Sequence, residues 1–267
     1  MKYSLIANPE HSENEIHVAK IVEKLKDVEL EARTAELIGK EGVSIDNLSG
    51  DVLIVLGGDG TILYTLQHIN IPIFPINTGS VGFLSETAAN NDYNRYLDEL
   101  EKKNYEIEDV QRVDLFCNKL KMGTALNEVV LHAAHVSRIQ TFEIKVNDRS
   151  IETVRSDGII IATPTGSTAY AMSVGSPIIN PNVPCFVIVA IAPYSMNSRP
   201  IIISDEETLS IKTLTDKETV MVMDGQEEIA INTDDDIEIK RSEEPAKLIR
   251  FSTSFFERMN TKLRKEE

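Results

Sequence analysis

The segment DVLIVLGGDGTIL, residues 51–63, constrains the fold of this chain more than any other stretch. Its first half is an almost unbroken apolar run, which is typical of a strand buried in a sheet. The run breaks at residues 57–61, Gly-Gly-Asp-Gly-Thr, and a new apolar pattern begins at once. A buried strand that passes directly into a helix favours a parallel sheet covered by helices.

The first hundred residues repeat this alternation of strand and helix. Strands are expected at 2–7, 51–56 and 71–76, and helical periodicity is found at 13–28, from 61 to 68 and at 92–103. Open α/β sheets bind ligands at the carboxyl ends of their strands. The glycine-rich loop follows such an end, so the sequence predicts a ligand site there.

After residue 104 the pattern changes to short strands separated by turn residues, with little helical periodicity. This predicts a mostly antiparallel β domain. Near the end of the chain, Ser254 and Glu257 have the spacing of a capping box, which predicts that a helix starts there. The expected strands of the second domain are 113–118, 126–132, 141–146, 158–162, 185–191, 200–204, 208–213, 220–223 and 236–241.

The loop at 57–61 has the composition of a phosphate-binding turn. Glycines permit positive φ and leave main-chain N–H groups open to phosphate oxygens, and Thr61 adds a hydroxyl. No G-x-x-x-x-G-K-[ST] or G-x-G-x-x-G is present, which argues against Walker-type NTPases and the dehydrogenase dinucleotide fingerprint. Asp59 would then accept the proton of a substrate hydroxyl or hold a metal ion. The alternative is a plain turn in which Asp59 caps the helix.

A second polar cluster, Thr-Pro-Thr-Gly-Ser-Thr-Ala-Tyr at 163–170, follows the strand expected at 158–162. Hydroxyl groups before a short helix bind polar ligand edges well, and Tyr170 offers a face to a ring. The alternative is a Ser/Thr-capped helix with a tyrosine in the core. Asn127 and Glu128 interrupt an apolar strand, either as site residues or as ordinary residues of a strand edge.

The formal net charge of −16 at pH 7 narrows the choice of partners. A field of that sign repels nucleic acid and anionic membranes, so neither is expected as a partner. No apolar run approaches the roughly 18 residues that a membrane-spanning helix needs. Cys117 and Cys185 lack metal-ligand spacing and are expected to be free, buried thiols. We therefore expect a cytoplasmic protein.

The motifs together resemble those of the NAD kinase family. The GGDGT at 57–61 is shared with diacylglycerol- and sphingosine-type lipid kinases, whereas the run at 163–170, with Ser-Asp-Gly at 156–158, is close to the NAD kinase family's longest and most specific signature. The matches cover nearly the whole chain in family order: 57–61, then 77–84 (N-x-G-x-x-G-F-L), 126–128 (L-N-E/D), 156–158 with 163–170, and 224–226 (D-G-Q).

This resemblance implies a reaction and a set of site residues. The reaction would be Mg²⁺-dependent transfer of a phosphoryl group from ATP, or in some members polyphosphate, to the 2′-hydroxyl of the adenosine ribose of NAD, giving NADP. Asp59 would be the proton acceptor. The remaining residues implied to bind nucleotide are Gly57, Gly58, Gly60, Thr61, Asn127, Glu128, Arg138, Arg155, Asp157, Thr168, Ala169, Tyr170, Ala171, Met172, Ser173, Ala192 and Gln226.

The resemblance also implies a fold and an assembly. The family combines a Rossmann-like α/β domain, here 1–105, with a β-sandwich domain, here 106–251, and its C-terminal helix, here within 252–267, returns to the first domain. Members form homodimers or homotetramers. Tyr194 stands where many members have a histidine, and Ala190 replaces a common proline. These departures leave the expected chemistry unchanged, and no contact at the nicotinamide end is inferred from the resemblance.

Two other functions stay open. A lipid kinase would use the same glycine loop, but the acidic charge and the lack of a basic amphipathic helix argue against it. A non-catalytic NAD(P)-binding sensor would keep the fold, and the intact Asp59 argues against that. The residues leave undecided whether ATP or polyphosphate is the donor, whether NADH is accepted, and which groups bind Mg²⁺.

Overall fold

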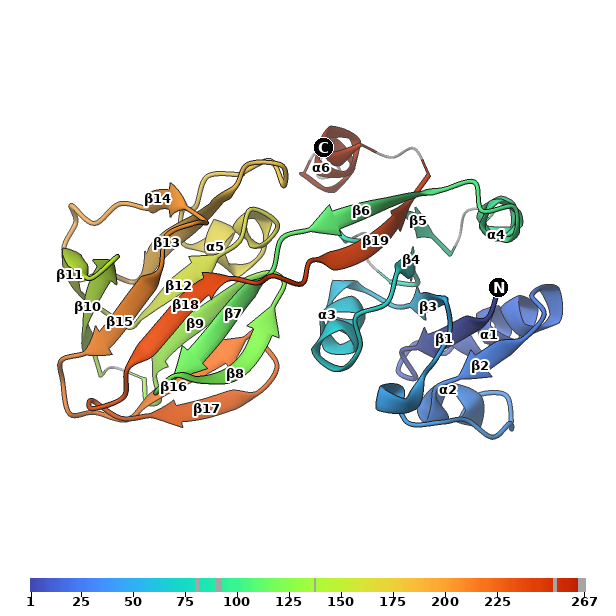
Figure 1. Cartoon of the computed structure of the whole chain (residues 1–267), viewed down its shortest axis with the longest axis horizontal. Helices are drawn as coiled ribbons and strands as arrows, with labels where there is room; N and C mark the ends of the chain where they lie inside the picture. The colour runs from blue at the N-terminus through green and yellow to red at the C-terminus, as the bar shows by residue number, and fades with distance from the viewer. Residues whose placement is uncertain (80–81, 90–92, 137, 252–253, 264–267) are drawn as a thin grey trace. The chain divides into compact units, whose positions relative to one another are not determined.

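The structure is a computed structural model that describes residues 1–79, 82–89, 93–136, 138–251 and 254–263. Its chain divides into two compact units (Figure 1). Unit 1 comprises Met1–Asp109 and Ala246–Glu267, and unit 2 comprises Val110–Pro245. The expected fold class is confirmed, because unit 1 contains a parallel sheet and unit 2 contains antiparallel sheets.

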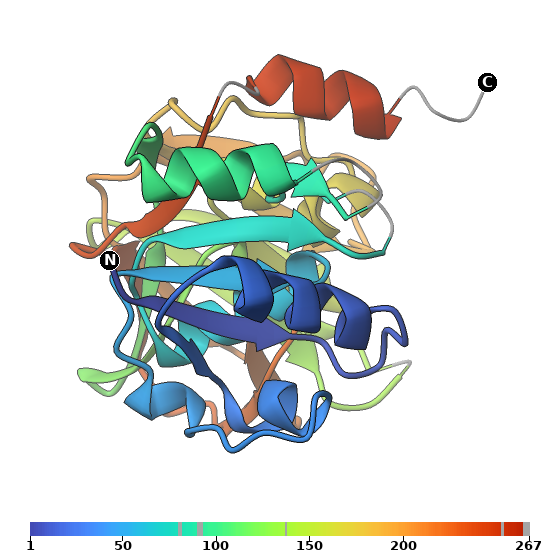
Figure 2. The ribbon, with the colours of Figure 1, turned by 90° about the vertical axis from the view of Figure 1, so that its right-hand side faces the viewer.

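Unit 1 is built on a seven-stranded sheet with the order β2-β1-β3-β4-β19-β6, and β5 pairs with β4. Its strand pairs β2–β1, β1–β3, β3–β4 and β4–β19 are parallel. Figure 2 shows this sheet with α1 and α4 on the face turned to the viewer. The elements of unit 1 are β1 Tyr3–Ala7, α1 Asn14–Lys24, β2 Val28–Leu30, α2 Ala32–Glu36, the 3₁₀ helix η1 Ile45–Asn47, β3 Val52–Leu56, α3 Asp59–His68, β4 Ile73–Asn77, β5 Thr87–Ala88, α4 Asn94–Glu101, β6 Glu106–Val110, β19 Ala246–Arg250 and α6 Phe255–Leu263.

The central strands of unit 1 are buried and mostly apolar because helices cover both faces of the sheet. Every residue of β1, β3 and β4 is buried. Val18 of α1 and Leu97 of α4 pack with Ile54 and Phe74 into one core. Strand β19 joins this sheet beside β4, so the chain returns to unit 1 at Ala246, earlier than the expected position 252.

Unit 2 consists of two six-stranded antiparallel sheets, with the orders β11-β10-β15-β18-β7-β8 and β14-β13-β12-β9-β16-β17. Side chains of both sheets form one core, which includes Phe142, Leu131 and Ile159. The strands and helices are β7 Val113–Cys117, β8 Leu120–Ala125, β9 Glu128–Ala133, β10 Gln140–Val146, β11 Arg149–Ser156, β12 Gly158–Ala162, the 3₁₀ helix η2 Gly166–Thr168, α5 Tyr170–Ser173, β13 Cys185–Ile191, β14 Ile201–Ser204, β15 Leu209–Thr213, β16 Thr219–Met223, β17 Glu228–Ile231 and β18 Ile237–Arg241.

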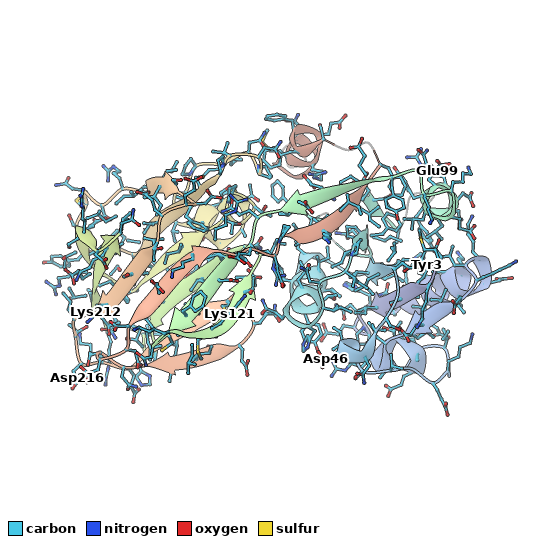
Figure 3. The ribbon with its side chains drawn as sticks, in the orientation of Figure 1. Tyr3, Asp46, Glu99, Lys121, Lys212 and Asp216 are labelled. Carbon is cyan, nitrogen blue, oxygen red and sulfur yellow. The ribbon has the colours of Figure 1, made fainter. Side chains whose placement is uncertain are left out.

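The two sheets of unit 2 differ in how they are covered. Strand β10 alternates between buried and half-buried residues, as one solvated face requires, whereas β12 is buried at every position. The second face of β12 packs with Ala171 of α5 and with Ile179. At the edge of the first sheet, Lys121 of β8 forms an ion pair with Asp114, with 2.9 Å between nitrogen and oxygen (Figure 3). A charged edge discourages pairing with other chains.

Three hairpins of unit 2 turn through two successive residues with positive φ. They are Asn118-Lys119 between β7 and β8, Asn147-Asp148 between β10 and β11, and Asp224-Gly225 between β16 and β17. Positive φ at both central positions is the requirement of a type I′ turn, which matches the twist of the flanking strands. Strands β8, β11 and β17 were not predicted, although these Asn- and Asp-containing dipeptides are a signal that could have found them.

Several smaller expectations have a clear outcome. The capping box is confirmed: the Ser254 N–H donates to Glu257 Oε2 at 2.7 Å, and the Glu257 N–H donates to Ser254 Oγ at 3.3 Å. Cys185 is buried as expected, but Cys117 is only half-buried. Among the described residues, no helix is both long enough and apolar enough to cross a membrane.

The core of unit 2 predicts a large difference between two leucine-to-alanine substitutions. Leu209 is 0% exposed and Leu120 is 70% exposed. Leu209→Ala should lower the free energy of unfolding by about 2–5 kcal/mol, because it removes buried methyl groups and leaves a cavity. Leu120→Ala should change it by less than about 0.5 kcal/mol. Urea unfolding followed by circular dichroism measures both, and equal losses would contradict this assignment of the core.

Candidate active site

The glycine-rich loop of unit 1 joins β3 to α3 at the carboxyl end of the parallel sheet. Gly57, Gly58 and Gly60 do not have positive φ. A Cβ on Gly57 would collide with the Thr61 side chain, whereas a Cβ on Gly58 or Gly60 would meet nothing within 4 Å. The glycines are therefore not needed for a left-handed turn. Gly57 allows the strand to approach the helix, and the other two leave bare backbone open at the start of α3.

Asp59 is the first residue of α3, and Gly58 is the N-cap, so Asp59 does not cap the helix. Its carboxylate accepts the backbone N–H of Phe83 at 2.9 Å and that of Leu84 at 3.2 Å. A Cβ on Gly82 would collide with the same carboxylate. The 77–84 motif, of which Ser80 and Val81 lie outside the described residues, therefore supports the side chain of the 57–61 motif.

Arg250 of β19 holds the segment that carries Leu84. Its guanidinium donates to the Leu84 carbonyl oxygen at 2.8 Å and to Glu108 Oε2 at 2.6 Å. Glu86 accepts the Phe251 N–H at 3.1 Å. Residues more than a hundred positions apart thus fix the amides that face Asp59, and the sequence carries no local signal for these contacts.

Loops on both sides of the glycine-rich loop meet at this edge of the sheet. Strand β3 lies between β1 and β4, and the His11 ring, after β1, lies against Gly79, after β4. Residues 8–13, 57–61 and 77–84 include no lysine or arginine. Among the described residues no group of three or more His, Cys, Asp or Glu could hold a metal ion. A phosphate here would be met by backbone N–H groups of the loop.

In unit 2, a second carboxylate organises the Leu126-Asn127-Glu128 segment. Asp224, in the turn between β16 and β17, accepts the N–H of Leu126 and of Asn127 at 2.7 Å each and that of Glu128 at 3.1 Å. The amides of Leu126 and Asn127 therefore bind Asp224 and not a neighbouring strand, and β9 begins at Glu128 instead of at the expected residue 126. Asp224 was not predicted as a site residue.

The 163–170 run holds the same segment from the other side. Thr163 donates its hydroxyl to the Leu126 carbonyl at 2.6 Å and its N–H to the Asn127 carbonyl at 2.8 Å. A Cβ on Gly166 would collide with the Asn127 backbone. The Ser167 hydroxyl donates to Pro164 O at 2.6 Å. These hydroxyls therefore serve the internal framework, although we expected them to bind ligand edges.

The short helix after this run presents side chains to the surface. Tyr170 is 42% exposed, so it is not a core tyrosine, and α5 has no side-chain cap. Met172 and Ser173 are also exposed, while Ala171 is buried in the core beneath. Thr168 and Ala169 precede them and donate to Thr165 O and Gly166 O. Gln226 is exposed in the Asp224 turn and donates its side-chain amide to Asp224 O at 3.2 Å.

Of the remaining predicted residues, Asp157 and Ala192 lie at the other end of the same sheet, whereas Arg155 is in β11 of the other sheet of unit 2. Ala162, at the end of β12, pairs with Glu128, whereas Gly158, at its start, pairs with His132 and Ile191. With a rise of about 3.3 Å per residue, Asp157 is about 16 Å from the level of Glu128.

This second group gathers around Asp157. Ala192 follows β13, with φ 45°, and Arg155 lies over the Tyr194 ring at 4.9 Å. The Tyr194 N–H donates to Arg155 O at 2.8 Å. Arg138 is exposed in the connection after β9. The predicted residues of unit 2 therefore form two groups, one around Asn127 and one around Asp157.

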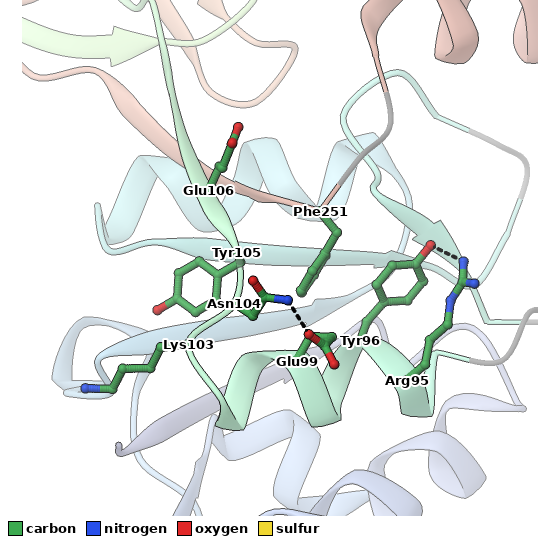
Figure 4. Close-up of a pocket in the computed structure, with 8 residues that line it drawn as sticks. All are labelled: Arg95, Tyr96, Glu99, Lys103, Asn104, Tyr105, Glu106 and Phe251. Atoms are coloured by element: carbon green, nitrogen blue, oxygen red, sulfur yellow. Dashed lines mark hydrogen bonds between the residues drawn. The ribbon is translucent and has the colours of Figure 1, made fainter.

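A pocket of about 490 Å³ lies elsewhere in unit 1 (Figure 4). Phe251 and Tyr105 contribute aromatic rings to its lining, and Glu99 accepts a hydrogen bond from Asn104 beside it. It contains none of the predicted site residues. Its lining is Arg95, Tyr96, Glu99, Lys103, Asn104, Tyr105, Glu106 and Phe251.

Comparison with protein-family models matches the N-terminal and the C-terminal parts of the chain to two domains of the same family. Residues 7–105 match the model of the ATP-NAD kinase N-terminal domain, and residues 126–251 match that of the C-terminal domain. The NAD kinase of Methanoregula boonei is 39% identical over 240 residues, which are 89% of this chain and 88% of that protein. The NAD kinase of Methanoculleus marisnigri is 34% identical over 270 residues, with 99% of each chain covered.

Solved structures agree. An NAD kinase from Archaeoglobus fulgidus in complex with ATP superposes with a TM-score of 0.80 at 30% identity, covering 99% of each chain. Yeast NADH kinase complexed with NADH superposes with a TM-score of 0.87 at 20% identity, covering 100% of this chain and 88% of that one, which shows the shared fold. The chain belongs to the NAD kinase family and is an enzyme.

Proposed function

We propose that this enzyme transfers a phosphoryl group from ATP to the 2′-hydroxyl of the adenosine ribose of NAD and so forms NADP. The observation that carries this proposal is the setting of Asp59. Its carboxylate follows a loop of bare glycine backbone at a helix N-terminus and is fixed by the Phe83 and Leu84 amides. A base beside a phosphate-binding loop is the arrangement that phosphoryl transfer to a hydroxyl requires.

Asp59 would accept the proton of the attacking hydroxyl. Each carboxylate oxygen can accept two hydrogen bonds, so an oxygen that accepts a backbone amide can also accept a substrate O–H. The amides also hold the carboxylate in one orientation, which lowers the entropy lost when substrate and base are aligned. The open N–H groups at Gly58 and Gly60 would stabilise negative charge on the transferred phosphoryl group.

We propose Mg²⁺ as the divalent cation. The described residues contain no cluster of three or more ligands, and the loops around Asp59 lack lysine and arginine. This fits Mg²⁺, which is usually bound by substrate phosphates with one or two carboxylates and several waters. When bound, Mg²⁺ would neutralise part of the negative charge of the phosphates, which these loops meet without a cationic side chain.

The Asn127 group of unit 2 would bind the dinucleotide. Asn127 and Glu128 are held by Asp224 on one side and Thr163 on the other, so little conformational entropy is lost when a ligand binds. The exposed Tyr170 ring offers a face for stacking. The ATP complex of the Archaeoglobus relative supports ATP as the donor. An assay of NADP(H) formation with NAD or NADH against ATP or polyphosphate tests donor and acceptor together.

Asp59→Asn should lower kcat for NADP formation by about 10²–10⁴-fold, because it removes the base. NAD binding, measured by calorimetry, should persist. The asparagine NH₂ would also face one of the two backbone N–H groups whose hydrogen bonds the Asp59 carboxylate accepts. That N–H would lose its acceptor, so we expect the free energy of unfolding to fall by about 1–3 kcal/mol. Asp46→Asn, which removes an exposed carboxylate of unit 1 paired with His68, is the matched control and should keep full activity.

Two outcomes would revise the role of Asp59. Wild-type activity in the Asn variant would exclude it as the base. Recovery of activity at high Mg²⁺ concentration would show that the carboxylate serves mainly to bind the metal.

We also propose that the enzyme is a homo-oligomer, while its cytoplasmic location stays a prediction. The Asn127 and Asp157 groups lie at opposite ends of β12 within one chain, so one bound dinucleotide would not use both groups of one subunit through the sheet. A second copy of the chain would supply the Asp157 group to the Asn127 group of its neighbour. A symmetric interface brings both such pairs together at once.

This assembly predicts complementation between two impaired variants. Asn127→Ala and Asp157→Ala should each be nearly inactive alone. When the two chains are co-expressed, about a quarter of wild-type activity should return, because half of randomly formed dimers are mixed and each has one intact site. Size-exclusion chromatography checks the oligomeric state. No recovery in a verified mixed oligomer would show that the two groups do not build a shared site.

A further inference from the structure

We propose that Glu128 carries a proton in the free enzyme and binds the dinucleotide as a hydrogen-bond donor. This assignment rests on the proposed function, in which the Asn127 group binds NAD. It adds a protonation state, a direction to the hydrogen bond and a dependence of NAD binding on pH.

The first support is the burial of an unpaired carboxyl oxygen. Glu128 is 6% exposed, and its Oε2 is buried without a hydrogen-bond partner among the described residues. Its neighbour across the β12 ladder is Ala162, which has no polar side chain to offer. A buried carboxylate without donors is costly, whereas a neutral carboxylic acid in the same place costs much less.

The second support is the Asp224 carboxylate next to this segment. Asp224 accepts three backbone N–H groups and is attracted by the Arg112 guanidinium, so its ionised form is stabilised. In the part of the chain that the structure describes, no donor serves Oε2 of Glu128. Two neighbouring buried carboxyl groups disfavour double ionisation, and the proton resides on the one with fewer donors. That group is Glu128.

The electrostatics agree with this geometry. Burial, and then the negative charge of Asp224, raise the pKa of Glu128 to about 8. Burial raises the pKa of Asp224 as well, but the three amides and Arg112 oppose this. At neutral pH, Glu128 is then mainly protonated.

Few other charged groups act on Glu128. Residues 162–173 include only Tyr170 as a titratable group. Arg112 acts on Asp224, and Asp114 and Glu244 act on Arg112. Burial is therefore the main cause of the raised pKa of Glu128, and the ionised Asp224 is the charge that adds to it.

A protonated carboxyl group changes which ligand atom it can recognise. An ionised glutamate only accepts hydrogen bonds, whereas the protonated form donates one O–H. The partner on the dinucleotide must then be an acceptor, such as a ribose oxygen, a carbonyl oxygen or a ring nitrogen. Ionisation of Glu128 removes that donor and places a second negative charge beside Asp224, so it should weaken binding.

The test is a calorimetric titration of NAD into the enzyme without ATP, from about pH 6 to about pH 10. The wild-type Kd should be constant at low pH and rise about tenfold per pH unit above about pH 8. Glu128→Gln, whose amide keeps an N–H donor without titrating, should bind as the wild type does at low pH and show no rise of this kind. Glu206→Gln removes the same charge at an exposed position of unit 2 and is the control. Its Kd should depend on pH as that of the wild type does.

A second readout reports the proton itself. At a pH above about 8, binding should take up protons in the wild type. Titrations in two buffers with different ionisation enthalpies detect that uptake, and it should be missing in Glu128→Gln. This measurement keeps its meaning even if the variant folds poorly, because the wild type alone must show the uptake.

Three outcomes distinguish a failure of the Glu128 protonation from a failure of the proposed function. A wild-type Kd that stays constant up to about pH 10 would overturn the protonation of Glu128. Loss of NAD binding in a folded Glu128→Gln protein at low pH would overturn it too, since a carboxylate acceptor would then be required. Absence of NAD binding in the wild type at every pH would instead reject the proposed function on which this inference rests.

Discussion

A carboxylate that accepts backbone N–H groups from a distant segment is the interaction on which the candidate site residues of each unit depend. In unit 1, Asp59 accepts the amides of Phe83 and Leu84. In unit 2, Asp224 accepts those of Leu126, Asn127 and Glu128. Such charge-assisted hydrogen bonds are stronger than neutral ones, and removing the acceptor leaves several buried donors unsatisfied. Each carboxylate therefore fixes a segment that lies outside a strand or at the very start of one.

Glycine is required where these supports come closest. A side chain on Gly82 would collide with the Asp59 carboxylate, and one on Gly166 would collide with the Asn127 backbone. Neither glycine has positive φ. The glycines of both motifs thus serve close packing between distant segments more than backbone conformation. This explains why short glycine-containing motifs far apart in the sequence belong to the same site.

Much of the fold followed from local pattern, and the misses have physical causes. Strands buried on both faces, such as β3 and β12, are continuous apolar runs and were predicted. Strand β6, with the sequence EIEDV, is charged and largely exposed, so its pairing with β19 was not visible. The start of α3 was expected two residues late, because the open glycines before it hide the helix boundary.

The sequence by itself determined the residue types of the site, because Asp59, Asn127, Glu128 and the glycine-rich turns lie in motifs specific enough to identify the family. Only the tertiary structure decided what those residues do to one another. It assigned the hydroxyls of Thr163 and Ser167 to internal support, separated the Asp157 group from the Asn127 group, and placed Glu128 beside Asp224. The physical reason is that hydrogen bonding and charge interaction act over a few ångströms, and folding alone brings residues a hundred positions apart within that range.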